Sequence, residues 1–111
     1  MILKLSAYAL MLALPCLLAA QGGNVENGKR LYLKDGCYEC HGYAGQGGAG
    51  ARLAPTVLSP ANFTKYVRHP SGSMPPYTDK VASDAELADI RAFLATMPKP
   101  PALKSIPMLN E

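Results

Sequence analysis

Cys37-Tyr38-Glu39-Cys40-His41 is the most informative segment of the sequence. Its two cysteines are separated by two residues, and a histidine follows the second one directly. Thiols at this spacing can each add across one vinyl group of a haem, and the adjacent imidazole can then bind the iron from one side. This is the signature of c-type haem attachment. The pentapeptide therefore predicts a covalently bound redox cofactor at the centre of the fold.

Two other interpretations of the same cysteines are open. A CxxC pair can form the thiol–disulfide site of a periplasmic oxidoreductase, but such pairs usually occur in a βαβ setting. No strand–helix alternation surrounds Cys37. A structural zinc site needs four ligands, and the sequence contains only one further cysteine, Cys16, and one further histidine, His69. Because Cys16 lies in a segment expected to be removed, haem attachment is the favoured interpretation.

Residues 1–20 have the pattern of a secretion signal. Lys4 precedes an apolar run over residues 5–14, and the segment ends in Ala19-Ala20. The run is too short to span a bilayer comfortably, and it leads into polar, Gly-rich sequence. We therefore expect a Sec-type signal peptide, cleaved near Ala20, and a protein localised in the periplasm. An uncleaved N-terminal membrane anchor is the alternative.

The mature chain is expected to be one small domain of nearly balanced charge. Cleavage would remove Lys4, which leaves ten basic and eight acidic residues, and two haem propionates would bring the net charge close to zero. Charge therefore indicates no nucleic-acid partner and no strongly charged membrane surface. About 90 residues bury little apolar surface without a cofactor. We expect a poorly folded apo-chain and no membrane span in the mature form.

Three helices are expected, and no segment shows the period of a strand. The first begins after Asn24, a suitable N-cap, and ends at Asp35-Gly36, so that it delivers the haem-binding loop. The second, residues 61–68, is started by Ser59-Pro60. The third begins with a capping box and is closed by Pro98. Its apolar stripe comprises Leu87, Ile90, Phe93, Leu94 and Met97.

The remaining segments are expected to be irregular. Residues 42–50 contain five glycines, and they form no phosphate-binding loop because no strand precedes them and no GK[ST] follows. Residues 99–111 are rich in proline and are expected to be an extended tail without a core of its own. Gly28 lies inside the first helix, where glycine costs roughly 1 kcal/mol relative to alanine. It is either needed for close approach by another helix or merely tolerated.

An iron bound by His41 has a second axial position to fill. Met97 lies on the apolar stripe, where a core role suffices, and Met108 lies in the tail. His69 lies at the expected end of a helix. Met74 is followed by two prolines, and such a stiff loop can hold a thioether against iron at a small ordering cost. We therefore predict Met74 as the second ligand. The alternative is an open position that binds O₂, NO or peroxide, as in a catalyst or sensor.

Three segments of the chain resemble the mono-haem class I cytochromes c. GNVENGKRLYLKDGCYECHG (23–42) is similar to the family's first helix and haem motif. SMPPY (73–77) is similar to its axial-methionine segment, and DAELADIRAFLATMP (84–98) to its last helix. The resemblance covers residues 23–98 and implies a cytochrome c domain over residues 21–98. It implies an all-α fold, with three to four helices packed around a covalently bound haem.

The same resemblance assigns roles to further residues. Gly28 and Tyr32 match positions at which the family's first helix contacts its last helix, which favours the packing explanation for Gly28. Phe93 and Leu94 match the corresponding positions of the last helix.

Two assignments by resemblance concern the surroundings of the haem. Pro55 matches a proline whose backbone carbonyl accepts from the other ring nitrogen of the proximal histidine, a bond that fixes the tautomer. Ala54 precedes it where the family often has glycine. Arg68 either meets a haem propionate or is a solvated arginine at a helix end.

The resemblance implies a carrier of single electrons, with one haem c per chain and an iron that cycles between Fe(II) and Fe(III). No acid–base pair or nucleophile constellation is evident, so we do not expect an enzyme in its own right. RHPSGSMPPYTDKV (68–81) also resembles small cytochromes that accept electrons from exported dehydrogenases. The expected partners are redox proteins, either a periplasmic dehydrogenase or a terminal oxidase. The chain is then a free carrier or a subunit of an oxidoreductase complex.

Overall fold

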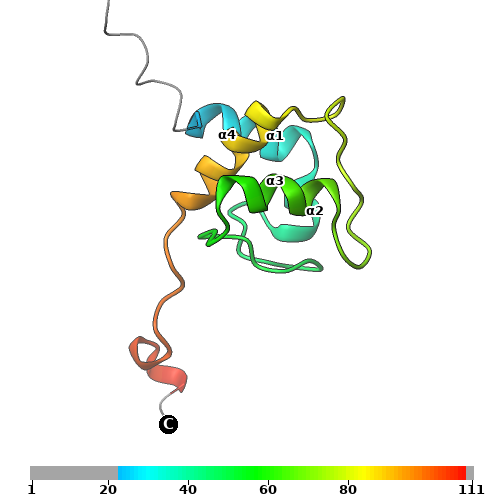
Figure 1. The fold of residues 1–111 in the computed structure, drawn as a ribbon. Helices are drawn as coiled ribbons and strands as arrows, with labels where there is room; N and C mark the ends of the chain where they lie inside the picture. The colour runs from blue at the N-terminus through cyan, green and yellow to red at the C-terminus, as the bar shows by residue number, and fades with distance from the viewer. Residues whose placement is uncertain (1–22, 110–111) are drawn as a thin grey trace, which may run out of the picture.

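The computed structural model describes residues 23–109, and these residues form helices and no strand. The elements are α1 (Val25–Lys34), α2 (Cys37–His41), α3 (Pro60–Arg68) and α4 (Asp84–Ala95), followed by the 3₁₀ turns η1 (Leu103–Ser105) and η2 (Pro107–Leu109). Figure 1 shows the four helices gathered into one body from which the C-terminal segment extends. The all-α prediction is confirmed. The predicted signal peptide lies outside the described residues.

The three predicted helix starts are confirmed by their caps. Asn24 caps α1 by accepting from the backbone N–H of Asn27 at 2.8 Å. Ser59 caps α3, with a proline in the first turn. Ser83 and Glu86 form the reciprocal capping box of α4, with bonds of 3.2 and 2.8 Å. Short polar side chains that satisfy free N–H groups therefore fix where each helix begins.

The structure differs from the predictions in one additional helix and in the end of the last helix. The segment from Cys37 to His41, expected as a loop, is the short helix α2. Gly36 makes this possible because its φ of 78° turns the chain sharply between α1 and α2. At the other end of the domain, α4 ends at Ala95 and does not reach Pro98. There the N–H groups of Thr96 and Met97 bond to carbonyls only three residues back, which tightens and ends the helix.

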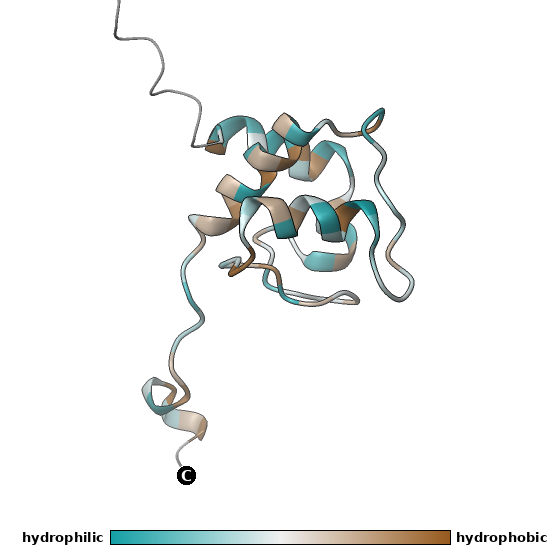
Figure 2. Ribbon diagram, viewed as in Figure 1, coloured by the Kyte–Doolittle hydropathy of each residue, from teal (hydrophilic) through white to brown (hydrophobic). Residues whose placement is uncertain are grey.

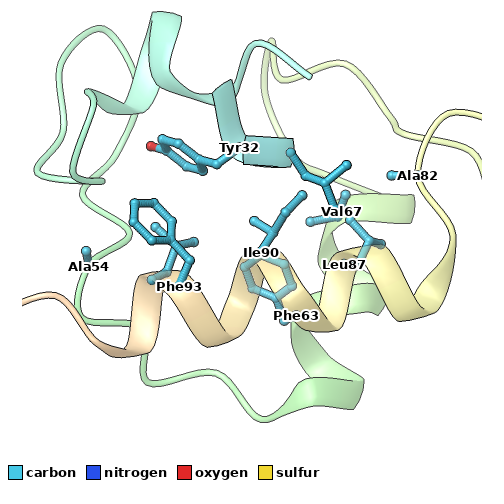
Figure 3. Packing of buried hydrophobic residues seen from close by; sticks show 10 residues of the cluster. Tyr32, Ala54, Phe63, Val67, Ala82, Leu87, Ile90 and Phe93 are labelled. Carbon is cyan, nitrogen blue, oxygen red and sulfur yellow. The ribbon is translucent and has the colours of Figure 1, made fainter. Parts of the chain in front are cut away.

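The core lies where α1 crosses α4, and α3 also packs against α4 (Figure 3). The rings of Tyr32 and Phe93 meet in a tilted arrangement, with their centroids 5.5 Å apart. Phe63 and Val67 extend this core from α3. Each helix carries both hydrophobic and hydrophilic residues, so it can bury one face and expose the other (Figure 2). The hydrophobic residues that are buried in this core are Leu31, Tyr32, Ala54, Phe63, Val67, Ala82, Leu87, Ile90, Phe93 and Leu94.

Gly28 occupies the point of closest approach between α1 and α4. A Cβ atom at this position would overlap the backbone carbonyl of Asp89. The side chain of Asp89 adds two bonds to the start of α1, from the N–H of Asn24 at 2.6 Å and from the amide of Asn27 at 2.8 Å. The packing explanation for Gly28 is confirmed, because only a residue without a side chain fits between the two backbones.

The C-terminal segment leaves the helical body after α4 and is extended as far as Ala102 (Figure 1). It then forms η1 and η2, which were not predicted and which pack against none of the four helices. The hydroxyl of Ser105 closes η1 by donating to the carbonyl of Ala102 at 2.7 Å. Among the described residues, no helix is both long enough and apolar enough to cross a membrane.

Candidate haem-binding site

The two cysteines of the motif lie three residues apart on α2, so they share one side of this helix. Both are free thiols. Cys37 is half-buried and packs against the core, whereas Cys40 is exposed. The thiol of Cys37 therefore faces the protein interior, and the thiol of Cys40 lies at the protein surface. This arrangement suits attachment of one edge of a flat ring to α2.

Burial raises the pKa of the Cys37 thiol to about 11, and the negative charge of Asp35 adds to this shift. Such a thiol is protonated at neutral pH, whereas the attacking cysteine of a thiol–disulfide enzyme has a lowered pKa. This difference argues against the oxidoreductase interpretation. Residues 23–109 also bring together no group of three or more His, Cys, Asp or Glu side chains that could hold a metal, so they supply no second pair of zinc ligands.

His41 is oriented by a hydrogen bond from its ring. Its Nδ1 lies 2.6 Å from the backbone carbonyl oxygen of Ala51. Because a carbonyl only accepts, Nδ1 carries the proton and Nε2 keeps its lone pair for a metal. The Gly-rich loop makes this contact by folding back on α2, with Gly47 N–H bonded to the carbonyl of His41 and Gly50 N–H to that of Cys40, both at 2.8 Å. The ring is thus ready to bind iron from one side.

The carbonyl that meets His41 belongs to Ala51 and not to Pro55, which corrects the residue assigned by resemblance. The reason is the tight path of the loop, which brings the chain to the imidazole four residues earlier than Pro55. A Cβ atom on Gly50 would lie 2.9 Å from Cε1 of His41, so a glycine is needed at this approach. Pro55 is half-buried and follows Ala54, whose N–H bonds to the carbonyl of Gly45 at 3.0 Å.

The four candidates for the second axial ligand lie in different surroundings. Met74 and Met97 are half-buried and pack against the core. Met108 is 83% exposed, and His69 is exposed at the end of α3. The structure therefore directs two of the four side chains toward the interior. Met97 lies just beyond α4 and not on its helical stripe.

Arg68 has two protein partners. Its Nη1 donates to the backbone carbonyl of Tyr77 at 2.8 Å, and its Nη2 meets a carboxylate oxygen of Asp84 at 2.7 Å. The side chain is only 16% exposed, so the structure argues against a solvated arginine, one of the two alternatives left open by the sequence. Its contact with a haem propionate stays a prediction.

Tyr77 and Asp35 are site residues that sequence analysis missed. The hydroxyl of Tyr77 donates to the backbone carbonyl of Asp35 at 2.8 Å, across 42 residues of sequence. This bond joins the loop that carries Met74 to the junction that precedes Cys37. The only sequence signal was a tyrosine placed directly after Pro75 and Pro76, which does not reveal a partner so far away along the chain.

The carboxylate of Asp35 is poorly solvated. Its side chain is 6% exposed, one oxygen lies 3.9 Å from Nζ of Lys34, and Oδ2 has no hydrogen-bond partner. Burial raises the pKa of this carboxyl, an effect that Lys34 opposes and Glu86 reinforces. The group also lies at the C-terminal end of α1, where the helix dipole disfavours negative charge. Ionised Asp35 therefore costs stability.

Replacing Asp35 with asparagine should raise the free energy of unfolding near neutral pH. Because the pKa is higher in the folded state than in the unfolded state, the wild-type protein loses stability as pH rises from the unfolded value through the folded value. An amide does not ionise, and it can donate to the free carbonyls at the end of α1. In thermal unfolding, the variant should have a higher melting temperature than the wild type at neutral pH, and the difference should disappear in acid. Asp79→Asn, at an exposed position, is the control and should have the melting temperature of the wild type at both pH values.

The residues present fit a haem. Two free thiols and an adjacent imidazole with Nδ1 already bonded could hold a c-type haem, and a methionine at the edge of the core could supply a second ligand atom. In an all-α domain whose first and last helices cross, this site defines a mono-haem class I cytochrome c. The family model described as "Cytochrome C oxidase, cbb3-type, subunit III" matches residues 23–94, and the chain belongs to this family. Comparison with the curated proteins and with the solved structures gave no match.

Proposed function

We propose that this cytochrome c is a carrier of single electrons in the periplasm, with one haem held by Cys37 and Cys40 and with His41 and Met74 as axial ligands. Membership of the family makes it a haem-based electron-transfer protein and not a catalytic enzyme. The main support for the proposal is the composition of α2. This helix contains two free thiols next to an imidazole whose ring is oriented by a hydrogen bond to the carbonyl of Ala51.

The residues around the site suit electron transfer more than substrate chemistry. When bound, the haem iron supplies the Fe(II)/Fe(III) couple. The bond to Ala51 fixes the ring of His41 and its tautomer. A thioether from Met74 favours the reduced state of the iron. A haem ring that is buried against the core would disfavour the additional positive charge of the oxidised iron. Both effects raise the reduction potential.

Localisation and partners are further parts of the proposal. The pattern of residues 1–20 supports export by a Sec-type signal peptide, with an uncleaved anchor as the alternative. The family description names an oxidase subunit, which supports a terminal oxidase as partner. The resemblance of segment 68–81 to electron-accepting cytochromes supports a periplasmic dehydrogenase as donor. A protein placed between the two would receive electrons from the dehydrogenase and pass them to the oxidase.

Expression together with a haem-attachment system tests the function. The purified protein should hold one haem per chain that survives acid and organic extraction, and it should cycle reversibly between ferrous and ferric spectra. Cys37→Ala and Cys40→Ala should each lower the yield of holoprotein, because each removes one thioether bond. Haem that extracts freely from the wild type would contradict covalent attachment. Rapid CO binding by the ferrous wild type would favour the open-site alternative.

A further inference from the structure

Tyr77 is tied to the protein through all three of its polar groups. Its N–H donates to the carbonyl of Val67 at 3.1 Å, and its own carbonyl accepts from Arg68 at 2.8 Å. Its hydroxyl donates to the carbonyl of Asp35 at 2.8 Å. The first two bonds anchor Tyr77 to the end of α3, and the third anchors it to the end of α1, two residues before the first haem-attachment cysteine.

Arg68 extends this anchorage to α4. Its second terminal nitrogen meets Asp84, the first residue of α4, at 2.7 Å. A guanidinium that is 16% exposed and bonded to a carbonyl and a carboxylate at once is well fixed, because charged hydrogen bonds are stronger than neutral ones. Tyr77 therefore has a position defined by three helices that are far apart in the sequence.

The chain between Tyr77 and Met74 is stiff, whereas the chain on the other side of Met74 is not. Pro75 and Pro76 separate the two residues, and each proline fixes its own φ. On the N-terminal side lies Gly72, with a φ of 69° and open space around it. A displacement of Tyr77 is therefore transmitted to Met74, while a displacement before Gly72 is absorbed by the glycine.

We propose that Tyr77 is the positioning residue of Met74, and that its hydroxyl bond to Asp35 keeps the thioether at the haem. The bond joins the loop of the sixth ligand to the start of the haem-attachment helix, so it sets the distance between the two sides of the haem site. The inference rests on the proposed function, since it takes Met74 as the axial ligand.

The test is Tyr77→Phe in the holoprotein, a change that removes one oxygen and keeps the ring. Because the two prolines couple Tyr77 to Met74, loss of this hydroxyl bond should weaken the Met74–iron bond by up to the net value of one hydrogen bond, about 1 kcal/mol. Cyanide, which displaces the methionine from ferric iron, should then bind more tightly than to the wild type, by up to about fivefold. The near-infrared sulfur-to-iron band should be lost at a correspondingly lower cyanide concentration.

Tyr66→Phe is the matched control. The hydroxyl of Tyr66 bonds to that of Ser71 at 2.9 Å and tethers the same loop, but on the far side of Gly72. This variant should bind cyanide as the wild type does. Equal cyanide affinities for Tyr77→Phe and the wild type would overturn the inference, and so would equal changes in the two tyrosine variants.

Arg68 gives a second way to test the inference if Tyr77→Phe does not fold. Arg68→Gln should increase cyanide affinity, and Arg68→Lys should recover part of the wild-type affinity because its ammonium can still donate to the carbonyl of Tyr77. The same affinity in both Arg68 variants and the wild type would count against the anchorage. A wild-type protein without the near-infrared band would instead contradict Met74 as ligand, and with it the proposed function.

Discussion

Replacing Met74 with alanine should abolish the near-infrared sulfur-to-iron band of the ferric protein. Alanine has no atom that can bind iron, so CO and cyanide should gain access to the open position. The reduction potential should fall, because thioether ligation favours Fe(II). Axial ligands set haem potentials over a range of about 0.8 V, so this change should exceed that of any substitution outside the site. Spectroscopy, ligand titration and potentiometry measure the three effects independently.

Met97→Ala is the control for this experiment, because it removes a second half-buried methionine at the edge of the same core. It should leave the near-infrared band unchanged and should lower the free energy of unfolding. A fully buried methionine costs roughly 2–5 kcal/mol when it is truncated to alanine, so a half-buried one should cost about 2 kcal/mol or less. A band that disappears in Met97→Ala and persists in Met74→Ala would reverse the assignment of the ligand.

Local signals in the sequence predicted the helices well. The capping residues Asn24, Ser59 and Ser83 each accept from the N–H group three positions further on, so their effect can be predicted without knowing the fold. The short helix α2 was missed because five residues are too few to show a period, and because its start depends on the left-handed turn at Gly36. The end of α4 was misplaced since Pro98 gave a visible stop signal, while the tightening at Thr96 gave none.

The attachment residues of the site could be predicted because they are contiguous, whereas the residues around them could not. Cys37, Cys40 and His41 form one motif, and its chemistry follows from its spacing. The partner of His41 depends on how sharply the Gly-rich loop turns, which decides between the carbonyls of Ala51 and Pro55. The contacts of Arg68 and Tyr77 depend on the packing of three helices, which no local pattern encodes. A single family resemblance supplied candidate positions but not these partners.

Gly28 is important for the stability of this arrangement, because α1 and α4 share the most extensive helix–helix contact of the described residues. Any side chain at position 28 meets the backbone of Asp89, and backbone cannot move aside by changing a rotamer. The two helices would have to separate, which would also weaken the contact between Tyr32 and Phe93 and the bonds from Asp89 to the start of α1. The junction that carries Cys37 follows α1 directly, so the haem site would shift with it.

A graded series at position 28 should therefore show progressive loss of the holoprotein. Gly28→Ala gains roughly 1 kcal/mol of helix propensity, but overpacking costs 1–3 kcal/mol, so a net loss of up to about 2 kcal/mol is expected. Gly28→Val adds two methyl groups to the same clash and should cost about 3 kcal/mol or more, a large part of the roughly 5 kcal/mol available to a small domain. Denaturant unfolding followed by circular dichroism measures the stability of the two variants, and the yield of haem-bearing protein measures the loss of holoprotein.

Lys29→Ala, at the neighbouring exposed position, is the control and should change the stability by no more than about 0.5 kcal/mol. Wild-type stability in Gly28→Val would show that α1 and α4 can separate at this point without cost.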